Sequence, residues 1–264
     1  MKKRSTPFTL DGKNMYVLGG GGLIGAAVVK ALAASGARVI ALDRDAARLR
    51  RLVTWACSHG KDVRAEVVDA SDLSAMEKVM RGLVRRHGAM SAWVNASYPR
   101  SKDWGRSLEA MTPEYLRENI DVHLNSCLWT ARVAALIMKE HKKGGVIVNF
   151  GSIYGMVAND LTIYEGTQMS GEMLYCGMKA GIINATRYLA SYFGAEGIRA
   201  NCICPGGIFD KQNPVFVKQY AKKTPLKRMG TPDDIAWPVV FLCSDAAAYM
   251  TGAVLSVDGG WTAV

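Results

Sequence analysis

Short apolar runs alternate with amphipathic segments along the whole chain. The apolar runs have the length and residue types of buried strands, and they lie at 14–18, 38–42, 63–68, 92–95, 145–150, 198–203 and 253–257. Segments with helical character begin between them, near positions 26, 45, 71, 112, 173 and 231. Such alternation is typical of strands and helices that share one parallel sheet. We therefore predict a single α/β domain over 1–264, a Rossmann-type doubly wound sheet of seven parallel strands with helices on both faces.

The length and hydropathy of the chain limit its class. It has 264 residues, 49% of them hydrophobic, which is enough for a sizeable core. No apolar run approaches the ~20 residues that span a bilayer. Residues 1–4 resemble the start of a signal peptide, but 5–14 supply no apolar core after it. We expect a cytoplasmic protein that does not enter a membrane.

Cysteine, histidine and charge patterns exclude other classes. The six cysteines are scattered through apolar segments, so we expect small buried side chains rather than disulfides. The four histidines are isolated, and we predict no metal site. The formal charge of +10 is spread over several helices instead of forming a stripe among exposed aromatics, so we predict no nucleic-acid partner. This excess of basic side chains forms either a solvated surface or a binding surface for an anionic partner.

A glycine-rich turn follows the first strand. Gly19, Gly22, Leu23, Ile24 and Gly25 lie between the strand at 14–18 and a helix-forming stretch. In a strand–turn–helix of this kind, glycines let backbone N–H groups approach a pyrophosphate, and the helix N-terminus adds partial positive charge. The alternative is a merely flexible loop.

Residues at the ends of the second and third strands are suited to the rest of a dinucleotide. Asp43 would accept hydrogen bonds from the ribose hydroxyls and repel a 2′-phosphate, which favours NAD. Arg44 argues the other way, because it could hold that phosphate, so NADP stays possible. Asp69, with Ala70 beside it, is placed to bind adenine.

Tyr175 and Lys179 are four residues apart in a segment with helical character, so they share a helix face. A fixed positive charge favours the phenolate form of a nearby tyrosine and makes it a usable acid/base. Ser152 follows a fully apolar strand, at the edge of an α/β sheet where ligands bind.

Taken together, the chain resembles the short-chain dehydrogenase/reductase family over almost its whole length. The resemblance is carried by the glycine turn, Asn95, Ser152, Tyr175 with Lys179, Pro205-Gly206, and the 251–260 motif. Three further stretches, at 152–155, 163–167 and 205–210, look like the branch called flagellin modification protein A, whose members are associated with the making of surface sugars, including nonulosonic acids.

The resemblance implies hydride transfer between a substrate carbinol or carbonyl carbon and nicotinamide. Tyr175 would be the general acid/base, Lys179 would support it and hold the nicotinamide ribose, and Ser152 would bind the substrate oxygen. Asn95, Pro205, Gly206 and Ile208 would contact the cofactor. The resemblance also implies a dimer or tetramer.

Several positions depart from the family pattern. Leu18 replaces the usual threonine, Ala96 the second asparagine, and Tyr98 a common glycine. His123 stands where an asparagine usually relays protons, and either an imidazole relay or a core histidine bonded to backbone fits that position. Asp210 replaces a threonine that usually helps to bind the carboxamide.

We predict an NAD(P)-dependent oxidoreductase that acts on a small polar substrate, a sugar or nucleotide sugar of surface-glycan synthesis. Residues 208–230 would form a substrate lid, and its Lys218, Lys222 and Lys223 suit an anionic substrate. A 3-oxoacyl thioester reductase and a non-catalytic dinucleotide-binding subunit are the alternatives.

Overall fold

The computed structural model describes residues 6–264. The basic stretch at 1–4, considered above as a possible signal-peptide start, lies outside the described residues. Among residues 6–264, no helix has the length and apolar character that crossing a bilayer requires.

A parallel sheet forms the centre of the described chain, in the order β3-β2-β1-β4-β5-β6-β7. The strands are β1 (Asn14–Leu18), β2 (Arg38–Asp43), β3 (Val63–Val67), β4 (Ala92–Asn95), β5 (Gly145–Phe150), β6 (Ile198–Pro205) and β7 (Val254–Val257). All six strand pairs are parallel. The predicted doubly wound, seven-stranded architecture is confirmed.

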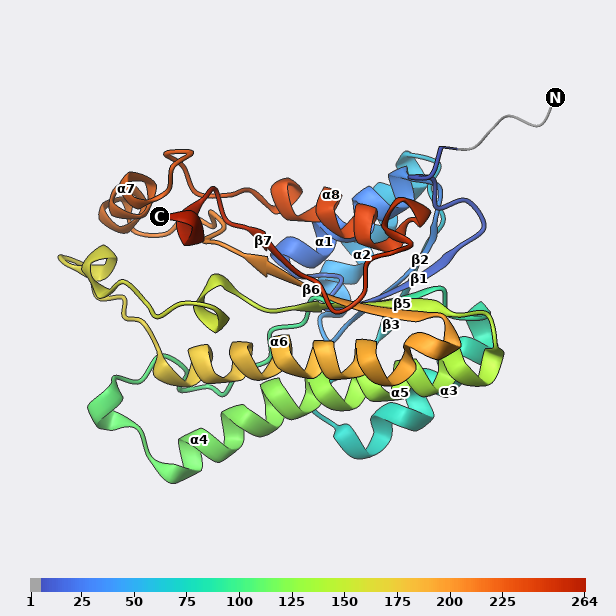
Figure 1. Cartoon of the computed structure of the whole chain (residues 1–264), viewed down its shortest axis with the longest axis horizontal. Helices are drawn as coiled ribbons and strands as arrows, with labels where there is room; N and C mark the ends of the chain where they lie inside the picture. Colours follow the sequence, from blue (N-terminus) through green and yellow to red (C-terminus); the bar gives the residue numbers. More distant parts are fainter. Residues whose placement is uncertain (1–5) are drawn as a thin grey trace.

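Helices cover both faces of the sheet (Figure 1). Their bounds are α1 (Leu23–Ala34), α2 (Ala46–Ser58), α3 (Leu73–His87), α4 (Pro113–Asn119), α5 (Ser126–His141), α6 (Met173–Phe193), α7 (Pro214–Lys223) and α8 (Pro232–Cys243). Helices α1, α2 and α8 pack on one face, and α3, α5 and α6 pack on the other. Helix α7 lies beyond the carboxyl ends of the strands, above the N-terminal end of α6.

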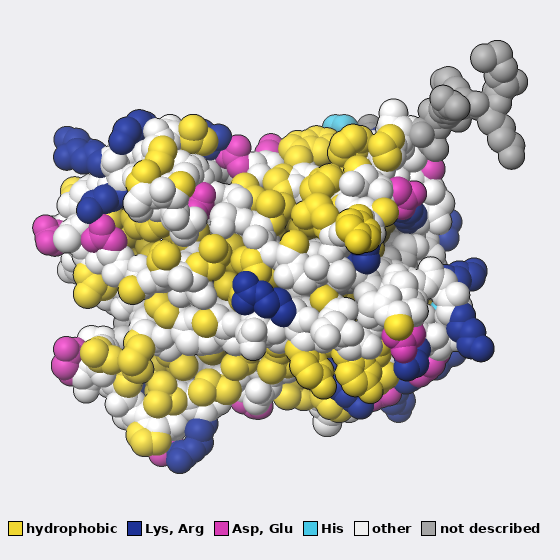
Figure 2. Space-filling view, viewed as in Figure 1, with side chains coloured by type: hydrophobic (Ala, Val, Ile, Leu, Met, Phe, Trp, Pro, Cys, Tyr) yellow, Lys and Arg dark blue, Asp and Glu magenta, His cyan; other side chains and the backbone are white. Residues whose placement is uncertain are grey.

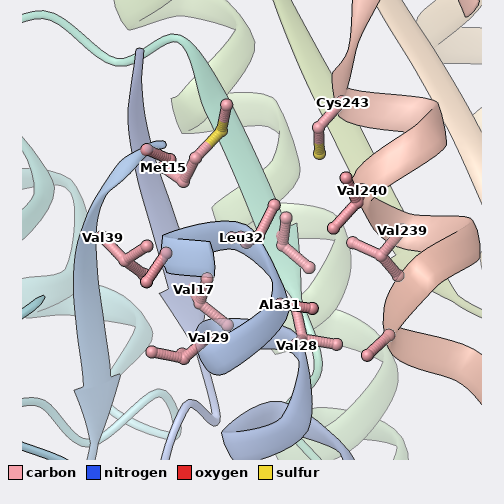
Figure 3. Close-up of a cluster of buried hydrophobic side chains, with 14 of the residues drawn as sticks. Met15, Val17, Val28, Val29, Ala31, Leu32, Val39, Val239, Val240 and Cys243 are labelled. Atoms are coloured by element: carbon pink, nitrogen blue, oxygen red, sulfur yellow. The ribbon is translucent and has the colours of Figure 1, made fainter. Parts of the chain in front are cut away.

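The packing between α1, α8 and the sheet fixes where α1 begins. Val28 and Leu32 of α1 meet Val17 of β1 and Val239 of α8 in a cluster that is closed to solvent (Figure 3). Burying one such side chain contributes roughly 1.5–3 kcal/mol. Because this cluster holds the helix against β1, it also holds the glycine turn that joins them.

Two helix starts differ from the sequence-based expectation. Helix α1 begins at Leu23 rather than near position 26, and Gly22 caps it without a side-chain hydrogen bond. Helix α3 is capped by Asp72, whose carboxylate accepts from the Ala75 N–H at 3.1 Å, and not by Ser71. Ser71 instead donates its hydroxyl to Asp69.

The long helical region predicted from 112 to about 141 contains a π-helical segment, Ile120–Asn125, between α4 and α5. Thr112 caps its start, as its sequence indicated. Ser126 Oγ donates to the Val122 carbonyl at 2.6 Å inside the wider turn. Single π-turns of this kind occur often at functional sites, and this one directs His123 inward, where it is buried.

The expectation for the cysteines holds only in part. Cys127, Cys202, Cys204 and Cys243 are buried, whereas Cys57 is exposed. The buried face of α2 is made by Leu49, Leu52 and Ala56, so Cys57 falls on the outer face of that helix.

Candidate active site

The candidate residues gather outside the carboxyl ends of the strands. Strands β1 and β4 are neighbours, with Leu18 opposite Asn95, and the strand order reverses between them. In open α/β sheets this switch point opens a crevice for ligands. In Figure 1 the carboxyl ends of the strands point to the left, the side on which α7 and the N-terminal end of α6 lie.

The glycine turn can accept a dinucleotide pyrophosphate. Gly19 has a φ of +75°, and a Cβ there would lie 2.7 Å from Ser97 Cα. A Cβ on Gly25 would lie 2.0 Å from the Gly19 carbonyl oxygen, so only glycine allows the helix to approach the turn. Since no side chain caps α1 at Gly22, the first N–H groups of the helix, including those of Leu23 and Ile24, remain for an anion.

Asp43 lies over this turn. Its carboxylate accepts from the Gly21 N–H and from the Asp45 N–H, both at 3.0 Å. Arg44 is exposed beside it. Asp69 is exposed and accepts from the Ser71 N–H at 2.9 Å, and Ala70 is buried. The residues present therefore fit a nicotinamide dinucleotide, because the turn leaves N–H groups for a pyrophosphate and a carboxylate lies over it.

Lys179 is buried beside Tyr175. Only 4% of Lys179 is exposed, its Nζ donates to the Phe150 carbonyl at 2.9 Å, and it lies 5.5 Å from the centre of the Tyr175 ring. No carboxylate of the described residues forms an ion pair with it. A buried ammonium compensated only by a carbonyl and aromatic faces is suited to stabilise a developing phenolate.

Ser152 is also buried and lies two residues beyond Phe150. Its Oγ accepts from the Tyr154 N–H at 3.1 Å, which leaves the hydroxyl proton free to be donated to a substrate oxygen. The following turn, Ile153–Gly155, packs on α6 so closely that a Cβ on Gly155 would lie 2.7 Å from the Lys179 carbonyl carbon. This contact brings Ser152 to the Lys179 end of the site.

His123 joins the same group of residues. Its ring centre lies 6.5 Å from that of Tyr175, and its Nδ1 lies 3.0 Å from the Pro99 carbonyl oxygen. A carbonyl only accepts, so Nδ1 carries the proton. Burial, and then the charge of Lys179, lower the pKa of His123 to about 3, and the imidazole is neutral at physiological pH.

The structure gives Asn95 a role within the chain. Its Oδ1 accepts from the N–H and the hydroxyl of Ser97, at 3.2 and 2.6 Å, and its Nδ2 donates to Thr130 at 3.4 Å. The side chain therefore holds the turn after β4 against α5.

Pro205, Gly206 and Ile208 lie where β6 enters the segment 208–230. The Gly206 N–H donates to the Val257 carbonyl at 3.0 Å, and Ile208 forms a parallel bridge with Gly230. A pocket of about 110 Å³ is lined by residues that include Gly206, Ile208 and Gly230. The two ends of the segment 208–230 are thus joined to each other.

A larger pocket, about 510 Å³, lies at the amino ends of the strands, away from the candidate residues. Its lining includes Asn14 and Arg38.

The buried side of α7 is aromatic, and its lysines are exposed to solvent. Phe216 and Tyr220 are buried, and Phe216 stacks on Tyr164 at 5.5 Å. Lys218, Lys222 and Lys223 are exposed, and Lys223 pairs with Asp160 at 2.7 Å. Figure 2 shows Lys and Arg side chains gathered on the outer surface around α7.

Two aromatic residues of the site lie on the segment after β4. The Tyr98 ring meets Tyr175 at 5.8 Å and 86°, and the Trp104 ring meets it at 6.4 Å and 76°. The sequence marked Tyr98 only as a departure from the family pattern. It gave no signal for Trp104, which lies in irregular structure between two elements.

Comparison with known proteins is consistent with this geometry. The family model described as "Enoyl-(Acyl carrier protein) reductase" matches residues 22–262. Galactitol 2-dehydrogenase of Rhizobium johnstonii is 32% identical over 97% of both chains. Post-translational flagellin modification protein A of Campylobacter coli is 30% identical over 96% of this chain and 99% of its own. A short-chain dehydrogenase from Leptospira borgpetersenii, solved with bound NAD⁺, is 33% identical, with a TM-score of 0.84 over 99% of this chain and 97% of that one.

The chain belongs to the short-chain dehydrogenase/reductase family. It is an NAD(P)-dependent oxidoreductase that acts on a CH–OH group of an alcohol- or sugar-type substrate.

Proposed function

We propose that this protein interconverts a secondary alcohol and a ketone on a sugar or sugar derivative, with Tyr175 as the general acid/base. The observation that carries the proposal is the buried Lys179 ammonium beside the Tyr175 ring, whose one hydrogen bond within residues 6–264 goes to the Phe150 carbonyl. Incubating the purified protein with NAD⁺ and a panel of sugars and polyols, while following reduced nicotinamide, tests it. Absence of turnover across the panel would count against the proposal.

Bound NAD(P) supplies the hydride acceptor, and this chain's residues manage the proton. Ser152 donates a hydrogen bond from its hydroxyl group to the substrate oxygen and thereby orients the substrate. Tyr175 takes the substrate's hydroxyl proton in the oxidation direction and returns it in reduction. Lys179 favours the phenolate by its charge. The same ammonium is placed to hold the nicotinamide ribose, beside contacts from Pro205, Gly206 and Ile208.

His123 takes part as a neutral group. Because its pKa is lowered to about 3, passing a proton through an imidazolium at pH 7 would cost roughly 1.4 kcal/mol for each unit between the two values. We propose that Nε2 accepts a hydrogen bond, while Nδ1 stays bonded to Pro99.

His123→Asn tests this assignment through stability. An unfolded histidine protonates near pH 6.5 and the folded one only near 3, so this residue's contribution to stability is lost as pH falls below 6.5. Between pH 7 and 5 we expect the wild type to lose about 2 kcal/mol more unfolding free energy than His123→Asn. Urea denaturation at the two pH values measures the difference. Equal losses would show that His123 is protonated in the folded protein.

We propose that NAD is preferred over NADP and that the Asp43 carboxylate, which accepts from the Gly21 N–H of the glycine turn, binds the adenosine ribose hydroxyls. Asp43→Ser should shift the ratio of NADPH to NADH affinity at least tenfold toward NADPH, about 1.4 kcal/mol. Titrations that follow nicotinamide fluorescence measure both affinities, and Asp45→Ser at the cap of α2 is the control. If Asp43→Ser left the ratio of NADPH to NADH affinity unchanged, Asp43 would not select the cofactor, and Arg44 would be the residue to test next.

The biological substrate is proposed from similarity. One relative is named a galactitol dehydrogenase and another a flagellin modification protein, which supports a sugar or nucleotide sugar, with a role in surface-glycan synthesis. Turnover of an acetoacetyl thioester with NADPH would instead favour the thioester reductase. Cofactor binding without Tyr175-dependent turnover would favour a non-catalytic subunit.

The segment 208–230 is proposed as the substrate lid. Its ends are joined at Ile208 and Gly230, and α7 packs on the 161–164 turn through Tyr164 and Phe216. Slower proteolysis within 208–230 when cofactor and substrate are bound would support this role.

We also propose that the protein forms a dimer or tetramer through α5 and α6, where Tyr188 and Tyr192 are exposed. Sedimentation analysis tests this assembly.

A further inference from the structure

Arg100 lies beside the catalytic candidates without an ion-pair partner. It follows Tyr98 and Pro99 on the segment after β4, and its side chain is exposed. The guanidinium carbon lies 5.2 Å from the centre of the Tyr98 ring, and that ring contacts Tyr175. Within residues 6–264, no carboxylate lies at ion-pair distance from Arg100.

The surroundings hold Arg100 in place. The Tyr98 ring also packs at 5.1 Å on His123 and at 5.9 Å on Trp104, and Pro99 is fixed through its carbonyl by His123 Nδ1. Stacking of a guanidinium on an aromatic face is itself favourable. Tyr98 remains 43% exposed, so this platform opens to the solvent side of the site.

A second arginine on the same segment, Arg106, differs from Arg100 because it has an ion-pair partner. Arg106 also stacks on a tyrosine, Tyr115, at 5.3 Å. Its charge, however, is paired with Asp103. Glu172, which also lies near the segment, accepts a hydrogen bond from the Tyr115 hydroxyl at 3.0 Å. Burial raises the pKa of its carboxyl, while the Tyr115 hydrogen bond and the nearby Arg100 charge act in the opposite direction. Arg100 therefore presents an exposed guanidinium that forms no ion pair with a carboxylate of residues 6–264, on the ring that contacts Tyr175.

We propose that Arg100 is a specificity-determining residue that binds the carboxylate of a polyhydroxy-acid substrate while Tyr175 acts on one of its hydroxyl groups. This inference rests on the proposed function and names its substrate class. A planar guanidinium matches a carboxylate in a two-hydrogen-bond fork. One unpaired cation matches a monoanion better than a phosphate dianion. Lys223 of α7 is paired with Asp160, and Lys179 Nζ donates to the Phe150 carbonyl, so neither ammonium group is without a partner as Arg100 is.

The test compares D-gluconate, D-glucitol and D-glucose 6-phosphate as substrates with NAD⁺, in wild type, Arg100→Gln and the control Arg106→Gln. We expect wild type to prefer gluconate. In Arg100→Gln the KM for gluconate should rise roughly 10- to 100-fold, with kcat and the KM for glucitol within about threefold and the NADH affinity unchanged. Arg106→Gln should leave all of these values near wild type, and Tyr98→Ala should raise the gluconate KM because the platform is lost.

A direct binding measurement separates this inference from the proposed function. Calorimetric titration of gluconate into the protein–NADH complex should show binding that Arg100→Gln weakens, even if none of the three compounds is turned over. Turnover of glucitol as efficient as that of gluconate, equal effects of Arg100→Gln on both, preference for the phosphate, or no gluconate binding would each overturn the carboxylate assignment. Failure of turnover across the whole sugar panel would overturn the proposed function instead.

Discussion

Tyr175→Phe is expected to lower kcat by about 10²- to 10⁴-fold while NADH still binds. The change removes only the phenolic oxygen, which forms no hydrogen bond with other described residues, so no buried partner is left unsatisfied. General acid/base catalysis contributes a rate factor of this size. Steady-state kinetics on the best substrate of the panel, together with nicotinamide fluorescence, measures the two quantities.

Tyr188→Phe on the same helix provides the matched control. Tyr188 is 66% exposed and stacks on Tyr192, on the part of α6 that points away from the Tyr175–Lys179 pair. Its removal should leave kcat within about twofold. If Tyr175→Phe kept wild-type kcat, the tyrosine-centred mechanism would be wrong, and a fall in both variants would indicate a general disturbance of α6.

Gly25→Ala is expected to destabilise the fold by about 3 kcal/mol and to abolish cofactor binding. The added Cβ would lie 2.0 Å from the Gly19 carbonyl oxygen and 2.8 Å from the Gly19 carbonyl carbon, and backbone cannot yield as a flexible side chain can. Either α1 moves away from β1, which opens the Val17–Val28–Leu32 packing, or the turn is distorted. Urea denaturation and NADH titration measure the two effects.

Two other glycines separate steric strain from loss of the pyrophosphate site. Gly82→Ala in the middle of α3, where only flexible arginine side chains lie within 4 Å, should stabilise the protein by up to about 1 kcal/mol. Gly22→Ala, whose Cβ would meet only the Gly19 carbonyl oxygen at 3.2 Å, should fold and yet bind NADH more weakly. A Gly25→Ala protein with wild-type stability and affinity would contradict the packing described here.

Strand and helix positions were readable from local pattern because burial imposes it. The runs at 14–18, 92–95 and 145–150 coincide with β1, β4 and β5, since strands covered on both faces are apolar throughout. Helix starts were less certain. Both Ser71 and Asp72 are suitable caps, and which side chain reaches the free N–H groups depends on the path of the chain.

The site could be predicted where one short stretch carries its own geometry. Tyr175 and Lys179 share a face because a helix repeats every 3.6 residues, and the glycine turn is defined by consecutive positions. The sequence could not predict in this way which charged side chains form ion pairs and which face solvent. Lys218, in the segment predicted to form the lid, faces solvent because Phe216 and Tyr220 occupy the buried side of α7.

The sequence by itself determined the parallel α/β sheet, the glycine turn after its first strand and the common helix face of Tyr175 and Lys179, because each depends on periodicity or on neighbours in the chain. Only the tertiary structure decided that His123 is held neutral, that Asn95 supports the turn after β4, that Tyr98 contacts Tyr175 and that Arg100 lies over the Tyr98 ring. Those properties arise from burial and from contacts between segments far apart in sequence, and neither is encoded in any local pattern of residues.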